Sequence, residues 1–244
     1  FLFFLGFLRP LYGVVASAIL LAALILCFRR RFQDLTQRPF SWQPKDISRL
    51  TIIILLSLLW MFLAGVGGFT GQAGDYIKHN TILLELINDP WPPRVPDLAL
   101  PGVTTWLVYY PAWYLPAAVV GKLLGWNAAY AFLTLWTAFG VFLSLSWLMR
   151  IQRGLSVQTF LIFIILGGLD IIGYGLLRPD GQLIRGDSYF EWWSQALCYP
   201  SNSTSLDYAP QHALPAWILM SMLLHDVFRR RRLADLGLYL LVAF

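Results

Sequence analysis

The stretch LTIIILLSLLWMFLAGVGGFTGQAGDYIKHN, residues 50–80, decides the fold, because an apolar run passes directly into a dense polar segment. A helix that crosses a bilayer needs about 20 mostly apolar residues. Residues 50–69 meet this requirement, and we expect them to span a membrane. The polar residues of 70–80 would then lie where the chain leaves the bilayer.

Further apolar stretches lie on both sides of this one. The chain is 58% hydrophobic and only 13% charged, with two cysteines that form no metal-binding or disulfide pattern. Soluble domains carry roughly 25% charged residues. We expect a single transmembrane domain, an all-α, polytopic transmembrane helical bundle. Its other spans are expected at residues 10–28, 128–149, 157–177, 211–228 and, as the start of a last span, 236–244. Residue 1 is Phe and the last residues are apolar, so we also expect the chain to be a piece of a longer protein.

Residues 103–124 are apolar enough to cross, yet Pro111 and Pro116 stand there among tyrosines and tryptophans. Such a mixture is typical of an interfacial helix. The charge balance favours the same interpretation. If this stretch does not cross, twelve of the 18 Lys and Arg residues lie on one side; if it crosses, each side holds nine. Because Lys and Arg collect on the cytoplasmic side, we predict an interfacial juxtamembrane helix in the first external loop.

This topology leaves two long external loops, at about residues 70–127 and 178–210. They hold eight of the 13 acidic residues, and we expect function to lie there. The net charge of +5 comes from basic clusters beside apolar runs, which orient membrane proteins and do not indicate a nucleic-acid partner. We predict an integral membrane protein of the bacterial plasma membrane, with its functional loops outside the cytoplasm.

The segment GDYIKHN holds the densest chemistry, with Asp75, Lys78, His79 and Asn80 within six residues. On a helix the first three share one face, so that a carboxylate base lies beside groups able to bind phosphate. The alternative is an ordinary helix start in which Asp75 is the N-cap and Lys78 extends toward the lipid headgroups.

Other candidate residues lie at the same predicted depth. Gln211 and His212 begin the fifth span, where a histidine caps a helix or contacts a lipid phosphate. Asp170, near the outer end of an apolar helix, either lines a water-filled cavity or hydrogen-bonds at the helix end. Arg178 and Trp91 belong to external loops whose charged and aromatic residues suit sugar binding, or an aromatic belt equally well.

The order of these motifs resembles the GT-C superfamily of membrane glycosyltransferases. An acidic residue directly after a span, Asp75 in GDYIKHN, resembles the catalytic carboxylate of their first external loop. The stretch YYPAWYLPAAVVGKLLGWN is similar to their juxtamembrane helix, and DYIKHN, WPP, YYPAWYLP, GLDIIG and PQHALPAW together resemble a group of uncharacterised bacterial membrane proteins. The similarity covers roughly residues 50–228. The chain departs from the pattern in having a span before residue 50 and no paired Asp-Glu or Asp-x-Asp at Asp75.

The resemblance implies transfer of a sugar from a polyprenyl-phosphate-linked donor to an acceptor hydroxyl, with inversion and with Asp75 as general base. Asp170 is a second catalytic candidate on the physical argument above. The partners would be this donor and membrane lipid; no cofactor is identified, and the involvement of a divalent metal stays open. A transporter or flippase of lipid-linked saccharides and a non-catalytic assembly subunit are the alternatives.

Overall fold

A computed structural model describes residues 1–36, 44–72, 74–97, 102–107, 109–152, 157–165 and 200–225. These residues are mostly helical, which confirms the predicted all-α class, with one short β-hairpin added. The elements are α1 (Leu2–Phe7), α2 (Pro10–Thr36), α3 (Pro44–Leu63), α4 (Asp75–Asn88), β1 (Arg94–Pro96), β2 (Thr104–Trp106), the 3-10 helix η1 (Pro111–Trp113), α5 (Leu115–Leu124), α6 (Trp126–Gln152), α7 (Val157–Ile165), α9 (Asn202–Tyr208) and α10 (Pro210–His225). Residues 166–177, 226–228 and 236–244 of the expected spans lie outside the described residues, as do Asp170 and Arg178.

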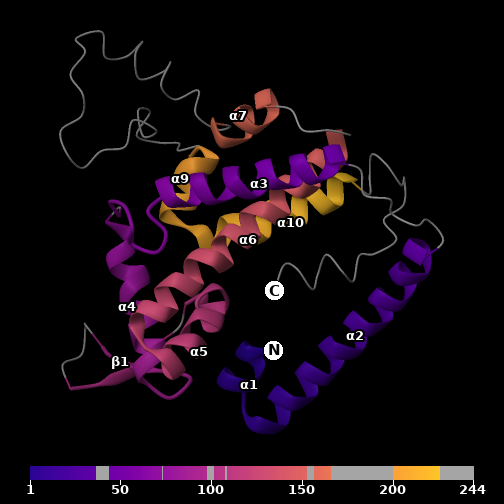
Figure 1. Ribbon diagram of the computed structural model, residues 1–244. Coiled ribbons are helices and arrows are strands. Elements are labelled where there is room, and N and C mark those ends of the chain that lie inside the picture. Colours follow the sequence, from indigo (N-terminus) through magenta and orange to yellow (C-terminus); the bar gives the residue numbers. More distant parts are fainter. Residues whose placement is uncertain are drawn as a thin grey trace, which may run out of the picture.

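Helix α6 is the centre of the fold and contacts α3, α5 and α10 (Figure 1). Helices α3 and α10 run beside it, α5 lies near the end of α6 where Trp126 begins that helix and contacts α4, and α9 lies beside α7 and α10. Helix α2 runs apart from this group in Figure 1 and makes its extensive contacts with α1. The short connecting helices therefore meet at one end of the α3, α6 and α10 group.

The predicted span at residues 50–69 is too long at its end, because α3 stops at Leu63. The backbone of Gly65, Gly67 and Gly68 takes positive φ angles of 74°, 85° and 72°, a region that helices of L-residues avoid. The hydroxyl of Thr70 donates to the Phe62 carbonyl at 2.7 Å and so serves the open end of α3. The turn that follows brings the chain to α4.

The prediction of one helix over residues 103–124 is wrong for its first half. Strand β2 pairs antiparallel with β1, η1 follows, and α5 takes up only the last ten residues. Proline explains the division, because it lacks an N–H and is tolerated only in the first turn of a helix. Pro111 begins η1, and Pro116 lies at the start of α5. A helix is thus present in this stretch, but it is shorter than expected.

Among the described residues one helix, Trp126–Ile151, is long and apolar enough to cross a membrane, with a mean hydropathy of 1.7. Shorter apolar helical stretches are Pro10–Leu26, Ile47–Leu63 and Leu115–Leu124. Their bounds lie near three stretches that the sequence analysis singled out as apolar.

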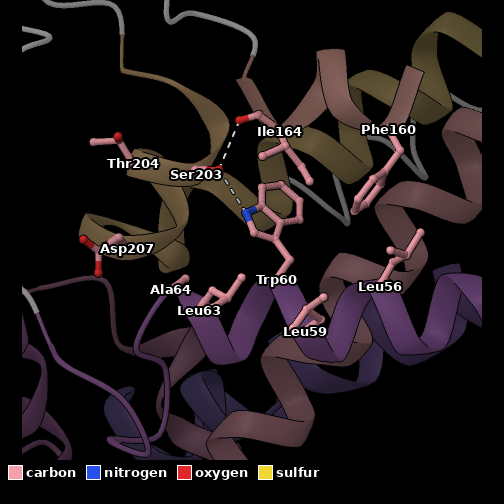
Figure 2. Close-up of a pocket in the computed structure, with 10 residues that line it drawn as sticks. All are labelled: Leu56, Leu59, Trp60, Leu63, Ala64, Phe160, Ile164, Ser203, Thr204 and Asp207. Carbon is pink, nitrogen blue, oxygen red and sulfur yellow. Dashed lines mark hydrogen bonds between the residues drawn. The ribbon is translucent and has the colours of Figure 1, made fainter. Parts of the chain in front are cut away.

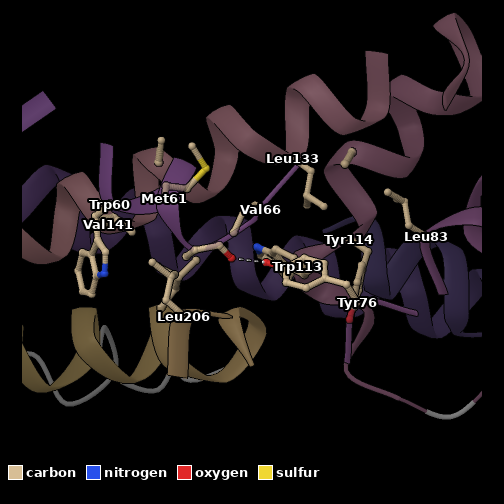
Figure 3. Packing of buried hydrophobic residues seen from close by; sticks show 14 of the residues in the cluster. Trp60, Met61, Val66, Tyr76, Leu83, Trp113, Tyr114, Leu133, Val141 and Leu206 are labelled. Atoms are coloured by element: carbon tan, nitrogen blue, oxygen red, sulfur yellow. Dashed lines mark hydrogen bonds between the residues drawn. The ribbon is translucent and has the colours of Figure 1, made fainter. Parts of the chain in front are cut away.

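The buried core runs from Trp60 and Val141 to Leu83, through residues of α3, α6, α9 and α4 (Figure 3). Small polar residues are buried with it, among them Ser57, Thr137 and Ser144. The Thr137 hydroxyl donates to the Leu133 carbonyl at 2.7 Å and accepts the Trp113 indole N–H at 3.1 Å. This last bond joins η1 to α6. It thereby also helps to hold Tyr109 and Tyr110, which directly precede η1 in the sequence.

Candidate functional site

Asp75 is the first residue of α4, and its carboxylate forms an ion pair with Lys78 one turn later at 3.2 Å. Both side chains stay about half-exposed, at 47% and 42%. The N-cap is Gly74, without a side-chain cap hydrogen bond, so the alternative in which Asp75 itself is the N-cap is wrong. A negative charge in the first turn is favourable because the helix dipole is positive there. The pair therefore presents both a carboxylate and an ammonium to solvent.

Tyr109 connects Lys78 to the start of α10. The Lys78 ammonium lies 5.6 Å from the centre of the Tyr109 ring, within reach of a cation–π contact. Burial alone would lower the pKa of Lys78, but hydrogen bonds to Tyr109 and Asp75 and their charges raise it on balance. The side-chain N–H of Gln211 donates to the Tyr109 hydroxyl at 3.2 Å. Lys78 and Gln211, which are 133 positions apart in the sequence, thus both contact Tyr109.

His212 follows Gln211 in the first turn of α10 and is exposed. Its ring packs edge-on against Tyr110 with a centroid distance of 4.5 Å. With Tyr109 and Gln211, these two residues line the polar end of a groove of about 700 Å³ between η1, α6 and α10. The rest of its lining is apolar, including Phe139 and Leu219. We call this cavity the α6–α10 groove.

The side chain of Gln211 contributes a buried oxygen without a hydrogen-bond partner to the lining of the groove. The residue is 8% exposed, and its side-chain oxygen has no hydrogen-bond partner among the described residues. An unpaired polar atom in a buried position costs about 1–3 kcal/mol. A ligand hydroxyl that donates to this oxygen would remove the penalty.

His79 faces the interior instead of a cavity, with 2% of its surface exposed. Its Nδ1 lies 2.5 Å from the Tyr114 hydroxyl and its Nε2 lies 2.9 Å from the Tyr208 carbonyl. Burial is the main cause that lowers the pKa of His79, so the ring is neutral at pH 7. Because a carbonyl only accepts, Nε2 carries the hydrogen and Nδ1 accepts from Tyr114. Both nitrogens are occupied, and the prediction that His79 binds substrate has no support in this geometry.

Asn80 and Trp91 also make contacts within the protein. The Asn80 side chain donates to the Gln72 side-chain oxygen at 3.1 Å and accepts the Tyr130 hydroxyl, so it ties α4 to the preceding turn and to α6. The Trp91 indole N–H donates to the Leu86 carbonyl at 2.7 Å, and its ring lies against Phe7 of α1. These contacts position both residues, and the substrate contact expected of each stays a prediction.

Asp207, near the end of α9, is a candidate site residue for which the sequence predicted no role. Burial, and then the charge of Asp75, raise the pKa of its carboxyl to about 6 from 3.8. The end of α9 lies against α4, because the Tyr208 carbonyl, next to Asp207 in the chain, bonds to His79 Nε2. The signal in the sequence was an acid four residues before Gln211, but only folding brings its helix to α4.

Asp207 also lines a second cavity, of about 370 Å³, between α3, α7 and α9 (Figure 2). We call it the α3–α9 pocket. Its polar lining residues are Ser203, Thr204 and Asp207 of α9, and Trp60 and three leucines of α3 line the opposite side. In the described ranges no group of three His, Cys, Asp or Glu side chains could hold a metal ion.

The site thus consists of two cavities: Asp207 lines the α3–α9 pocket, and Lys78, the ion-pair partner of Asp75, contacts Tyr109 of the α6–α10 groove. Comparison of the chain with models of protein families, with curated proteins and with solved structures gives no match.

Proposed function

We propose that the chain is a polytopic membrane protein whose site lies at the outer membrane surface. Large apolar side chains on α2, α3 and α6 point outward, for example Ile19 at 65%, Leu55 at 59% and Leu135 at 63% exposure. Small hydroxyl residues such as Thr137 are buried between elements instead. This distribution suits a lipid environment, because hydrocarbon covers apolar surface while small polar residues join helices. The Lys and Arg bias described above supports the orientation.

The proposed activity is transfer of a sugar from a polyprenyl-phosphate-linked donor to an acceptor hydroxyl. The observation that carries it is the convergence of Asp75, Lys78, Tyr109, Gln211 and Asp207 at one end of the helix group. Glycosyl transfer needs a base for the acceptor proton and positive charge for the leaving phosphate. The two carboxylates supply the first requirement, and Lys78 supplies the second.

The donor would lie in the α6–α10 groove, with its isoprenoid chain against Phe139 and Leu219 and its phosphate toward Lys78 and His212. The apolar lining and the polar end of the groove match a molecule with an apolar chain and a polar head. The Gln211 side-chain oxygen would accept a hydrogen bond from a sugar hydroxyl. This assignment gives the unsatisfied oxygen its partner.

In the transfer step the acceptor oxygen attacks the anomeric carbon, and the bond from that carbon to the phosphate oxygen breaks. The electron pair leaves with the phosphate, which gains a negative charge next to the Lys78 ammonium. The acceptor proton goes to the Asp75 and Asp207 pair. A single displacement of this kind inverts the anomeric carbon.

The test is substitution of Asp75 by Asn in protein reconstituted into liposomes and given radiolabelled polyprenyl-phosphate-linked sugars. We expect the rate of formation of the glycosidic product to fall about 100- to 10,000-fold, the usual contribution of a general base. Glu85→Gln, which changes a carboxylate elsewhere on α4, is the matched control and should keep the rate.

Near wild-type turnover of Asp75→Asn would remove Asp75 from the reaction. Mass analysis of the lipids separates the alternatives, since relocation of the labelled lipid without a new linkage would mean transport instead of transfer. If the labelled lipid neither gains a new linkage nor relocates, the protein is an assembly subunit.

A further inference from the structure

The α3–α9 pocket has a polarity that changes from one end to the other. Asp207 and Thr204 stand at one end, whereas Leu56 and Phe160 stand at the other (Figure 2). The apolar end follows α3, which we propose crosses the membrane, and the polar end lies at α9. A molecule that fits this pocket has an apolar chain along α3 and a polar group near Asp207.

Hydrogen bonds hold the walls of this pocket in place. The Trp60 indole N–H donates to the Ser203 hydroxyl at 3.0 Å, and that hydroxyl donates to the Ile164 carbonyl at 3.2 Å. The Asn202 side chain donates to the Phe163 carbonyl at 2.6 Å. These bonds link α9 to both α3 and α7. The pocket is therefore formed before a ligand enters, which lowers the entropy cost of binding.

Charge decides which polar group can lie at Asp207. The charge of Asp75 already raises the pKa of Asp207 in addition to the effect of burial. A phosphate placed there would add a third negative charge to the two carboxylates, and like charges repel strongly where water is partly excluded. A neutral hydroxyl instead donates a hydrogen bond to the Asp207 carboxylate, which is a strong acceptor.

The α6–α10 groove has the opposite preference. Its polar end is near the Lys78 ammonium and includes His212, and the described lining contains no carboxylate. Residues of α9 line the α3–α9 pocket and residues of α10 line the α6–α10 groove, and Ala209 alone joins these two helices. One cavity thus suits a lipid phosphate and its neighbour suits a lipid alcohol.

We propose that the α3–α9 pocket binds the acceptor, and that the acceptor is a neutral lipid whose hydroxyl contacts Asp207. This inference rests on the proposed function, of which it identifies the second substrate class. The acceptor hydroxyl loses its proton to the Asp207 carboxylate as its oxygen bonds to the anomeric carbon. The bond that breaks and the charge that leaves are those of the donor phosphate described above.

The experiment compares two photoreactive probes on the protein in liposomes: hexadecanol and hexadecyl phosphate, each carrying a diazirine in the chain. After irradiation the labelled peptides are identified by mass spectrometry. We expect the alcohol to label α3 and α7 around Leu59 and Phe160, and the phosphate to label α6 and α10 around Phe139 and Leu219. Labelling needs no turnover, so it is independent of whether the protein transfers a sugar.

A pocket-filling variant and a matched control make the result specific. Leu59 lines the pocket, and Leu55, one turn earlier on α3, is similarly exposed, at 59% against 54%, but lies outside the lining. Leu59→Trp should reduce alcohol labelling at α7 about tenfold, because the larger ring takes the space of the chain. Leu55→Trp should leave it unchanged, and Leu59→Phe provides a milder filling should the first variant fail to fold.

Asp207→Asn tests the charge argument, and we expect it to let hexadecyl phosphate label the α3–α9 pocket. Equal labelling of this pocket by both probes in the unaltered protein would overturn the proposal, as would alcohol labelling that Leu59→Trp and Leu59→Phe leave unchanged. The expected labelling pattern in a protein that forms no glycosidic product would remove the proposed function and keep the pocket.

Discussion

At the scale of single residues, the site depends on two acidic side chains in different surroundings. Asp75 is about half-exposed and ion-paired to Lys78, whereas Asp207 is partly buried and lines the α3–α9 pocket. Because a general base works best when its pKa is near the working pH, the raised pKa of Asp207 suits this residue to accept a proton.

The raised pKa of Asp207 predicts how both activity and stability depend on pH. The transfer rate should fall as the pH is lowered through about 6, because the carboxylate becomes protonated. Stability should change in the opposite direction. The folded protein binds this proton at about 6 and the unfolded chain near 3.8, so the free energy of unfolding rises as the pH falls between these values.

Asp207→Asn should remove this dependence. At pH 8 the variant should be more stable by about 1 kcal/mol, a figure reduced for solvent screening of a partly buried group. At pH 4 the difference should vanish, because Asp207 is then protonated. Thermal unfolding in detergent at the two pH values measures the effect, and a larger gain at pH 4 than at pH 8 would contradict the sign.

His79 is predicted to stabilise the site without contacting substrate. His79→Phe keeps a ring but removes the hydrogen bonds of His79 with the Tyr114 hydroxyl and the Tyr208 carbonyl, and each lost bond costs about 0.5–1.5 kcal/mol. The same buried ring should also weaken the fold at low pH. The pKa of His79 is lowered in the folded protein, so stability is lost as the pH falls below its ordinary value of 6.5.

Exposed His212 is the control for this substitution, because Phe has a ring that can keep the edge-on contact with Tyr110, and surface changes alter stability by about 0.5 kcal/mol or less. Denaturant titration of His79→Phe and His212→Phe in detergent compares them. An unchanged midpoint for His79→Phe, together with weaker binding of hexadecyl phosphate, would show that His79 contacts the ligand after all.

At the scale of elements, the turn between α3 and α4 brings α4, which carries Asp75, against the end of α9. The turn is compact because its glycines adopt positive φ and because Gln72 bonds both ways, donating to the Gly65 carbonyl at 3.1 Å and accepting from Asn80. The Tyr76 hydroxyl adds a contact with the Ala64 carbonyl at 3.4 Å. A chain with ordinary residues at these glycines could not follow this path.

Gly67→Ala should disrupt this turn, because Gly67 has a φ of +85° and an added Cβ would stand 1.8 Å from the Thr134 hydroxyl oxygen. We expect a loss of at least about 2 kcal/mol in the free energy of unfolding, from the left-handed backbone and the clash together. Gly71→Ala is the matched control in the same turn, since its Cβ would meet nothing within 4 Å. Equal stability of the two variants in thermal unfolding would show that the turn does not need glycine at 67.

At the scale of the whole molecule, the proposed topology has all candidate residues on one side of the membrane. The short helices α4, α5 and α9 gather with the ends of α3, α6 and α10 on that side (Figure 1). The basic clusters lie in the segments between the opposite ends of the predicted spans. Both features agree with an outward-facing site above a bundle that exposes apolar side chains to lipid.

Cysteine labelling tests this orientation. With Cys27 and Cys198 replaced by Ser, Ile77→Cys should react with a membrane-impermeant maleimide in intact cells, because Ile77 is 75% exposed on α4. Arg30→Cys should react only after the membrane is opened. Labelling of position 30 and protection of position 77 in intact cells would invert the topology.

The amino-acid sequence by itself determined the helical class, the order of the apolar stretches and the segment with the densest chemistry. The length of an apolar run and the charges beside it are local quantities. The apolar stretches at residues 50–69 and 128–149 could therefore be recognised without knowledge of any tertiary contact. The pairing of Asp75 with Lys78 also followed from helical spacing alone.

Only the tertiary structure decided what each polar residue faces. Asp207 belongs to the site because α9 packs against α4. His79 does not, because both of its ring nitrogens form hydrogen bonds within the protein, to Tyr114 and Tyr208. Such long-range contacts depend on how helices pack, which spacing along the chain does not encode. For the same reason the two cavities, with their opposite preferences for charge, could not be read from residues 200–225 before α3, α7 and α10 had been placed around them.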